Sequence, residues 1–372
     1  MNYSKIIDLK DFETPQLQPF LKDLAEIEMR RFGITKPIII PDSKHWECAM
    51  AMRSFEEFGL LKEGRVFAGI GAGTEGTTFF LASKGCITFP CDRYMEDTCW
   101  SDVAPIGMML NPQWYSELKF PVGNVIPVNT DARKLRLPSS FFDGIYSSGS
   151  IEHFGSLEAV SAAAKEIARV LKPGGIASIS TEFRLDGPED RQWFDDNCIL
   201  FTPDLIDQYI LKTSGLELIG ELNTLPSDET FYTRKRLVDF LDSVQSVNTL
   251  ADKQAAYPNL VLDHEGFLFC SVHLLLKKPH DLDEGSDANI FDHFDEEILR
   301  NNEAANSALS ILRCRQDGME NSVSSPQEVV LSNEEMLIKI LKSKKHLIPK
   351  PLIPIFSKGF EFLYQSGVFR KR

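Results

Sequence analysis

The sequence predicts an α/β protein built on a mostly parallel sheet. Short apolar runs alternate with stretches of helical spacing, a glycine-rich turn follows the first of these runs, and acidic residues follow the next two. The 372 residues, 43% of them hydrophobic, are enough for a full-sized core. We therefore expect seven strands with helices packed on both faces of the sheet.

The first unit of this pattern is a strand, a turn, a helix and a second strand. Residues 66–70 are apolar and suit a buried strand, 71–73 (Gly-Ala-Gly) form a tight turn, 74–83 have helical spacing, and 87–89 read as the next strand. Glycine lets the backbone approach a ligand, and the helix N-terminus offers free N–H groups. Asp92, after the second strand, is placed to accept hydrogen bonds from a ribose diol.

The glycine turn by itself leaves two cofactors open. Gly71, Gly73 and Gly76 fit the dinucleotide pattern G-x-G-x-x-G. Gly69, Gly71 and Gly73 also fit the looser G-x-G-x-G of methyl-donor enzymes. The choice therefore depends on residues further along the chain.

The remaining elements follow in order. The expected strands are 125–128, 143–148, 176–180, 216–222 and 266–276, and the expected helices include 19–31, 156–171 and 205–212. The Lys-Pro-Gly-Gly sequence at 172–175 should end the second of these helices, because proline cannot continue it and glycine can adopt a left-handed turn. Residues 225–262 read as an insertion, whose basic cluster at 234–236 we interpret as a solvated face rather than an anion site.

Three regions follow from this pattern. We expect an N-terminal cap over residues 1–44, a main domain over 45–279, and an extension over 280–372. The extension is first acidic, with 12 acids against 3 bases from 281 to 328. It then becomes basic, with 9 bases against 1 acid from 339 to 372. We expect a helix near 294–312, a poorly ordered Ser-rich stretch, and a terminal segment that packs back on the protein, with membrane or partner contact as the alternative.

Composition excludes several classes of function. A formal net charge of -14 argues against general nucleic-acid binding, which needs a basic surface. No apolar run is long enough to span a membrane, and the N-terminus does not resemble a signal peptide. Seven cysteines without a C-x-x-C pair suggest reduced thiols in a cytoplasmic protein and no metal site.

Two aromatic-rich stretches could serve either packing or a ligand. Trp46 precedes the first strand, and we expect it to pack in the core rather than cover a cofactor. Residues 93–120 lack clear periodicity and carry Trp100, Met108, Met109 and Trp114. Such a loop can form an acceptor pocket, although local packing is the more frequent role of these residue types.

A later block decides between the two cofactors. Residues 141–183 contain Phe142-Asp143 at the start of a strand, Glu152-His153 in the following loop, and Arg-Val-Leu-Lys-Pro-Gly-Gly at 169–175. The block resembles class I S-adenosylmethionine-dependent methyltransferases of the type 11 group, and the resemblance covers roughly residues 45–278. It implies a Rossmann-like fold. A hydride-transferring short-chain enzyme would instead carry Tyr-x-x-x-Lys in its second half, where this sequence has none.

The resemblance also implies the residues that bind S-adenosylmethionine. Its methionine part would lie against Gly71 and Gly73, its ribose against Asp92, and its adenine beside Arg93, Asp131 and the backbone N–H of Ala132, with Ser148 under the sulfonium. The sequence departs from the family at Gly69, where an acid is usual, and at Glu75, where a third glycine is common. Glu75 can replace the missing acid at the donor's amino group or simply cap the following helix.

Methyl transfer needs a general base only when the acceptor must lose a proton. His153 is the first candidate base, with Glu152 as its orienting partner or a ligand for a divalent ion, and Glu182 is the second candidate. His264 and His273 are expected to be structural. The predicted function is methyl transfer to a hydroxyl of a small-molecule or glycan acceptor, by similarity to bacterial enzymes of sugar and polysaccharide assembly. The alternative is a non-catalytic, donor-binding adaptor that acts through its extension.

Overall fold

The computed structural model describes residues 2–282, except 33, 97, 117, 194–197 and 246. The described residues belong to the first of two units into which the chain divides, Met1–Phe291. The predicted helix near 294–312, the Ser-rich stretch and the basic terminal segment all lie outside the described residues. The boundaries expected at 44 and 279 are not tested by this division and stay predictions.

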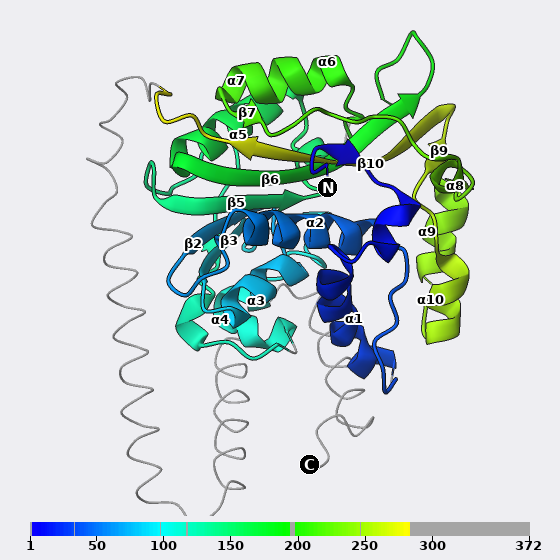
Figure 1. The fold of residues 1–372 in the computed structure, drawn as a ribbon, viewed down its shortest axis with the longest axis horizontal. Coiled ribbons are helices and arrows are strands. Elements are labelled where there is room, and N and C mark those ends of the chain that lie inside the picture. The colour runs from blue at the N-terminus through cyan, green and yellow to red at the C-terminus, as the bar shows by residue number, and fades with distance from the viewer. Residues whose placement is uncertain are drawn as a thin grey trace, which may run out of the picture. The chain divides into compact units, whose positions relative to one another are not determined.

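One sheet runs through the first unit, and Figure 1 shows its strands side by side with helices on both faces. The order along the sheet is β4-β3-β2-β5-β6-β10-β9-β8, with β1 and β7 also paired to β10. The strands are β1 (Lys5–Ile6), β2 (Val66–Ile70), β3 (Ile87–Asp92), β4 (Val128–Asn129), β5 (Phe142–Ser148), β6 (Leu171–Asp186), β7 (Glu217–Leu218), β8 (Lys235–Arg236), β9 (Leu262–His264) and β10 (Phe267–Lys277). In the described residues each of the seven expected strands overlaps an observed one, but β4 shares only Val128 with the expected 125–128, where Val125 forms an isolated bridge to Thr88. Strands β1, β8 and β9 are additional.

The pairing within the sheet is parallel from β4 to β6. β3 lies between β4 and β2, and β5 lies between β2 and β6, each pair parallel. β10 then runs antiparallel to β6. The strand order therefore reverses between β2 and β5, which is where an open α/β sheet binds its ligand.

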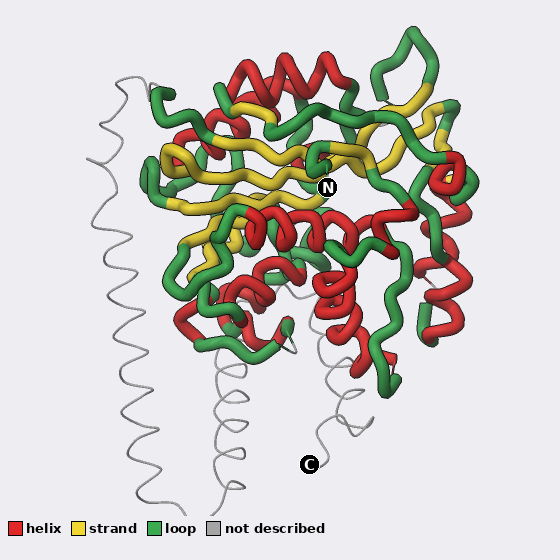
Figure 2. Tube along the Cα trace, in the orientation of Figure 1, coloured by secondary structure: helices red, strands yellow, loops and turns green. Residues whose placement is uncertain are grey.

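Helices cover both faces of this sheet (Figure 2). They are α1 (Gln18–Phe32), α2 (Ser43–Glu57), α3 (Gly76–Ser83), α4 (Gly107–Leu110), α5 (Leu157–Val170), α6 (Pro203–Ile206), α7 (Lys212–Ser214), α8 (Asp228–Phe231), α9 (Leu237–Gln245) and α10 (Leu250–Ala256). The shorter turns are η1 (Leu9–Glu13), η2 (Pro112–Tyr115), η3 (Val122–Asn124), η4 (Ile151–His153) and the π-helical η5 (Asp207–Leu211).

Helix α5 shows how the sequence sets an element. Ser156 caps its N-terminus by accepting a hydrogen bond from the backbone N–H of Ala159. Its predicted apolar face is buried, and the helix ends at Val170, just before the Lys-Pro-Gly-Gly sequence. Gly174 has φ +76°, the left-handed conformation that the sequence predicted for this stop. Strand β6 begins immediately, because Leu171 already pairs with Phe142 of β5.

The N-terminal residues take part in the sheet rather than only covering it. Lys5 pairs with His273 of β10, and the backbone N–H of Asn223 donates to the carbonyl of Ser4. The apolar pattern continues to 222, but β7 ends at Leu218. Ile219 still donates its backbone N–H to the carbonyl of Leu275 in β10, and by Asn223 the chain bonds to the N-terminal segment instead.

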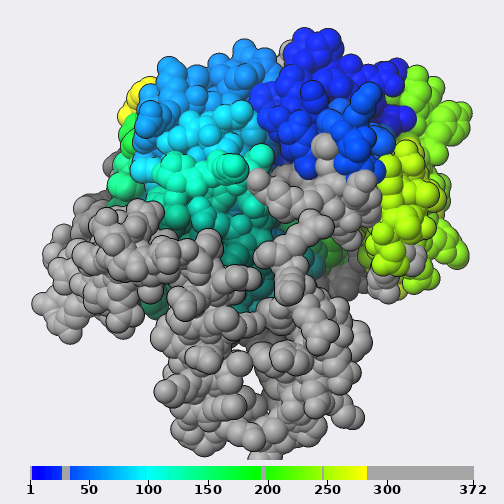
Figure 3. All heavy atoms as spheres, turned by 90° about the horizontal axis from the view of Figure 1, so that it is seen from below, coloured from blue at the N-terminus to red at the C-terminus, as the bar shows by residue number. Residues whose placement is uncertain are grey.

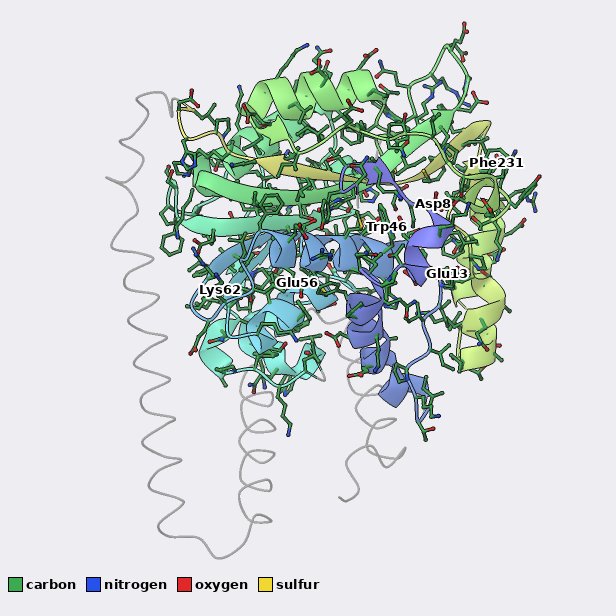
Figure 4. All side chains as sticks on the ribbon, viewed as in Figure 1. Asp8, Glu13, Trp46, Glu56, Lys62 and Phe231 are labelled. Carbon is green, nitrogen blue, oxygen red and sulfur yellow. The ribbon has the colours of Figure 1, made fainter. Side chains whose placement is uncertain are left out.

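Figure 4 places Trp46 between the sheet and the N-terminal segment that carries Asp8 and Glu13. The Trp46 side chain is 0% exposed, and its indole N–H donates to Asp11 Oδ2 at 2.9 Å. Its predicted packing role is confirmed. Asp8 in turn accepts from Ser227 Oγ at 3.1 Å, which joins the N-terminal segment to the insertion.

The insertion folds into α8 to α10 with β8 and β9. Its basic cluster is engaged locally: Arg234 Nε donates to Asp263 at 3.1 Å, and Arg236 Nε donates to Asp239 at 2.7 Å. Both arginines are therefore paired with a nearby carboxylate, while Lys235 Nζ donates to the carbonyl of Ala256 at 2.5 Å. Seen from below, the N-terminal residues (blue) lie between the cyan residues around α3 and the yellow-green insertion (Figure 3).

Candidate methyl-donor site

The carboxyl ends of β2, β3 and β5 open on a cavity of about 1050 Å³. Parallel strands bring residues that follow them to one edge of the sheet, so positions far apart in the sequence meet there. Of the predicted cofactor residues, those that line the cavity are Gly71, Gly73, Glu75, Asp92, Arg93, Asp131, Ala132 and Ser148. Gly69 does not line it.

The glycine turn is held by the protein's own neighbouring segments. Gly71 has φ +63° and Gly73 has φ +44°, conformations that favour glycine. A Cβ on Gly71 would lie 2.5 Å from Ser150 Oγ, and one on Gly73 would lie 2.4 Å from the carbonyl oxygen of Val103. The turn therefore fits between the loop after β5 and the segment after β3.

Gly69 has a different role from the other two glycines. It lies inside β2, where a Cβ would approach the ring of Tyr146 to 2.5 Å. The Tyr146 hydroxyl is 2.8 Å from Thr78 Oγ1 of α3, so the ring crosses beneath the turn and ties β5 to that helix. Glycine at 69 is thus explained by packing.

Asp92 stands at the end of β3 with its carboxylate beside the turn. Its Oδ2 accepts from the backbone N–H of Gly73 at 2.9 Å, and its Oδ1 accepts from that of Arg93 at 2.7 Å. Burial raises the pKa of this carboxyl, and the two backbone hydrogen bonds oppose the rise. The carboxylate is thereby fixed in orientation at the cavity wall.

Asp131 and Arg93 lie further along the same edge, each with a charged partner. Arg133 Nε donates to both carboxylate oxygens of Asp131, at 2.9 and 3.0 Å, and this contact lowers the pKa of Asp131. Arg93 Nε donates to Glu96 at 2.8 Å. This end of the cavity therefore presents paired charges and suits an uncharged ring.

Glu75 precedes α3 but does not cap it, because no side-chain capping bond forms. The capping alternative is therefore wrong. Ser148 Oγ donates to Glu75 Oε1 at 3.5 Å, and burial raises the pKa of Glu75 to about 8, although Lys44 opposes the rise. The carboxyl faces the cavity in a position where a cation would relieve the cost of its burial.

Lys44 is a cavity residue that the sequence analysis missed. Asp42 caps α2 by accepting from the backbone N–H of His45, and the helix start directs Lys44 to the end of β5. Its Nζ donates to the carbonyl of Ser148 at 2.5 Å and to Glu47 Oε2 at 2.9 Å. The cavity thus holds an ammonium group and a carboxyl group near Ser148. The sequence offered one signal for this position: Asp42, a residue type that caps helices, stands directly ahead of the helix that precedes β2.

His153 lies in η4 at the cavity wall, as predicted, and its ring packs on Trp100 with centroids 4.5 Å apart at 41°. Its Nε2 is 3.8 Å from Glu152 Oε1. Glu152 itself is buried and does not line the cavity, and its Oε2 accepts from Thr181 Oγ1 at 2.8 Å. Burial raises the pKa of Glu152, and His153 opposes the rise.

Glu182, the second candidate base, lies on β6 and is not part of the cavity wall. Burial raises its pKa to about 8, and the nearby carboxylates of Glu152 and Glu47 add to the rise. His273 is buried between Ser178 Oγ at 2.7 Å and the carbonyl of Tyr3 at 2.6 Å, and burial lowers its pKa to about 4. Its predicted structural role is confirmed.

The aromatic loop after β3 divides into two sets of residues. Met108 is buried in a small apolar cluster, which confirms the expectation of local packing. For Trp100 and Trp114 that expectation is wrong: both are exposed and both line the cavity.

In the described part of the chain, no group of three or more His, Cys, Asp or Glu residues could hold a metal. No helix there has the length and apolar character needed to cross a membrane.

Comparison with known proteins assigns a family to this region. Residues 69–179 match the model of the methyltransferase domain family. No curated protein matches the chain.

Similar solved structures share little sequence. One is 1,6-didemethyltoxoflavin-N1-methyltransferase of Burkholderia thailandensis with S-adenosylhomocysteine. It is 16% identical, the match covers 64% of this chain and 79% of that chain, and the TM-score is 0.38. Another, from Galdieria sulphuraria, carries the provisional description of a sarcosine dimethylglycine methyltransferase. It is 15% identical, the match covers 64% of this chain and 85% of that chain, and the TM-score is 0.41. A third is phosphoethanolamine N-methyltransferase 2 of Haemonchus contortus, at 16% identity, 73% and 61% coverage and TM-score 0.42.

The family match begins within β2 and ends within β6, so it spans the glycine turn, Asp92, Asp131 and the loop that carries His153. These are the residues that the fold gathers around one cavity. The chain contains a class I S-adenosylmethionine-dependent methyltransferase domain.

Proposed function

We propose that this methyltransferase acts on a hydroxyl group of a small-molecule or glycan acceptor, with His153 as the general base. The observation that carries the proposal is the position of His153, which stands in the wall of the cavity that also holds the predicted donor residues. A hydroxyl must lose its proton as it accepts the methyl group, and a neutral imidazole at the cavity wall can take that proton.

The charges of the residues that line the cavity support S-adenosylmethionine as the donor. Asp92 can accept from the ribose hydroxyls, while Asp131 and Arg93 border the adenine end. Near Ser148, Glu75 suits the donor's ammonium group and Lys44 suits its carboxylate. S-adenosylmethionine supplies a methyl group on a sulfonium, which is already activated for displacement. The protein's contribution is therefore to hold the acceptor oxygen in line and to remove its proton.

Glu152 acts through His153 in this scheme. It is buried, its Oε1 lies 3.8 Å from His153 Nε2, and Thr181 fixes its other oxygen. A carboxylate at that distance stabilises the imidazolium that forms when His153 takes a proton. Glu182 stays a second candidate, although its position outside the cavity wall does not favour it.

Replacing His153 tests the proposal. We expect His153→Ala to keep the affinity for S-adenosylhomocysteine and to lower methyl transfer by about 10²- to 10⁴-fold, the usual contribution of a general base. The assay is transfer of labelled methyl from S-adenosylmethionine to small molecules and glycans of a cell extract. His264→Ala is the matched control, because His264 lies on β9, away from the cavity.

Two outcomes would contradict the proposed role of His153. Full turnover by His153→Ala would exclude it as the base. No turnover by the unmodified protein on any fraction, with donor binding intact, would instead support the adaptor alternative.

A further inference from the structure

Exposed apolar side chains follow the donor cavity outward along the segment between β3 and β4. We define the apolar rim as Trp100, Val103, Ile106, Leu110 and Trp114. All five are exposed, Leu110 to 75% and Trp114 to 72%. A grouping of this kind beside a cavity is typical of a ligand-binding or interaction surface.

The apolar rim is not needed to hold its own segment in place. The segment has a separate inner cluster, in which Ala104, Met108 and Phe120 pack with Phe79 of α3. The rings of Phe79 and Phe120 stack with centroids 5.8 Å apart. Since the inward positions already anchor the segment, the outward apolar residues require another explanation.

Part of the apolar rim lines the cavity in which methyl transfer is proposed to occur. Trp100, Val103 and Trp114 line the same cavity as the glycine turn. The carbonyl of Val103 lies against Gly73, and the ring of Trp100 packs on His153. An acceptor whose reactive group reaches His153 would therefore extend over the apolar rim on its way out of the cavity.

The cavity also has room for two ligands. Pockets that bury a drug-sized ligand measure roughly 300–1,000 Å³. This cavity, at about 1050 Å³, lies at the upper end of that range, which suits a donor together with part of an acceptor.

We propose that the acceptor is an amphiphile, with a polar head that carries the methylated group at His153 and a hydrocarbon portion on the apolar rim. The inference rests on the proposed function and specifies its substrate class. Val103, Ile106 and Leu110 have aliphatic side chains, which offer no hydrogen bonds to a free glycan but bury hydrocarbon well.

The charges around the apolar rim favour a single amphiphilic molecule over an anionic lipid surface. Among the described residues of 93–122, two acids, Glu96 and Asp102, stand against two bases, Arg93 and Lys119. A surface of that balance lacks the excess of Lys and Arg by which anionic headgroups attract a protein. The apolar rim is therefore assigned to the acceptor's hydrocarbon portion.

A homologous series of alkyl β-glucosides, from methyl to octyl and below micellar concentrations, tests the inference on the intact protein saturated with S-adenosylhomocysteine. We expect the affinity measured by calorimetry to rise about two- to fourfold for each added methylene, since each buried CH₂ contributes about 0.8 kcal/mol when fully covered. Methyl glucoside serves as the reference for the head alone.

Two variants localise the effect. Trp114→Ala should lower the affinity for octyl glucoside at least about tenfold, as expected for an aromatic contact residue, and leave S-adenosylhomocysteine binding unchanged. Val122→Ala is the matched control, because Val122 is similarly exposed but does not line the cavity. It should leave both affinities unchanged.

The inference is overturned if affinity does not depend on chain length, or if Trp114→Ala and Val122→Ala behave alike. It is also overturned if octyl glucoside binds only after residues 339–372 are removed, because the chain's own terminal segment would then cover the apolar rim. Unaltered glucoside binding by Trp114→Ala, together with sedimentation on phosphatidylcholine vesicles, would assign the surface to a bilayer instead. Failure of S-adenosylhomocysteine to bind the unmodified protein would contradict the proposed function itself.

Discussion

Glu75 gives the most informative perturbation of the donor site. Its carboxyl faces the cavity, and burial raises its pKa to about 8, so at neutral pH it is mostly protonated in the free protein. The donor's ammonium group beside it would favour the ionised form. Binding should therefore release a proton from Glu75, and donor affinity should rise with pH until it levels off above about pH 8.

The size of the effect follows from that pKa. The ionised fraction of a carboxyl with a pKa of about 8 increases about 20-fold between about pH 6 and pH 7.5, and affinity should follow it. Calorimetric titration with S-adenosylhomocysteine across this range measures the slope. Repeating it in two buffers with different ionisation enthalpies measures the proton released.

Glu75→Gln should remove most of this pH dependence. Glu182→Gln is a matched control, because burial also raises the pKa of Glu182 to about 8 but its side chain does not line the cavity. Glu182→Gln should show the same change of S-adenosylhomocysteine affinity with pH as the unmodified protein. An unmodified protein with equal affinity at both pH values would refute the assignment of Glu75 to the ammonium group, as would an unchanged slope in Glu75→Gln.

Three further predictions concern the rest of the chain. Gly73→Ala should lower the free energy of unfolding, measured by chemical denaturation, by about 1–3 kcal/mol, because Gly73 has φ +44° and a Cβ there would lie 2.4 Å from a backbone oxygen. Gly123→Ala should be nearly neutral, because no atom lies within 4 Å of a Cβ at Gly123. Equal stability of the two variants would contradict this. Trp46→Phe removes the donor to buried Asp11 and should cost about 1–3 kcal/mol; an unchanged denaturation midpoint would show the hydrogen bond to be dispensable. Deleting residues 339–372 should leave S-adenosylhomocysteine affinity intact in calorimetry, and a large loss would mean that the terminal segment contributes to the site.

Much of the donor site could be predicted because it depends on local sequence and on one rule of parallel sheets. An apolar run followed by Gly-Ala-Gly and a helical pattern identifies a strand, turn and helix within 20 residues or so. Once Asp92, Asp131 and Ser148 are each placed at the carboxyl end of a strand or just beyond it, the sheet itself brings them to one edge. Their meeting therefore needs no knowledge of side-chain packing.

Residues that reach the cavity from outside this pattern were not predicted. Lys44 precedes the first strand of the motif and reaches the end of β5 only because α2 packs across the sheet. Val103 and Trp100 meet Gly73 and His153 through an irregular segment without periodicity. Such contacts arise from tertiary packing, which no local spacing encodes.

Gly69 and Glu75 combine a feature that the sequence shows with a cause that depends on tertiary packing. The departure from the family pattern was visible in the sequence, but its cause was not. Tyr146 lies across Gly69 and leaves no room for a side chain, while the only acid of the turn stands at Glu75, facing the cavity. The two departures from the family pattern are consistent with one arrangement. Tyr146 takes the space of a side chain at position 69 in β2, and Glu75, just before α3, supplies the carboxyl group instead.

Parallel calorimetric titration with S-adenosylhomocysteine and with NAD decides most directly which cofactor the glycine turn serves. The geometry of Asp92, Glu75 and Lys44 predicts that S-adenosylhomocysteine binds with a stoichiometry of about one per chain and raises the melting temperature, while NAD does neither. Binding of NAD in the absence of any binding of S-adenosylhomocysteine would contradict the assignment of this cavity to a methyl donor.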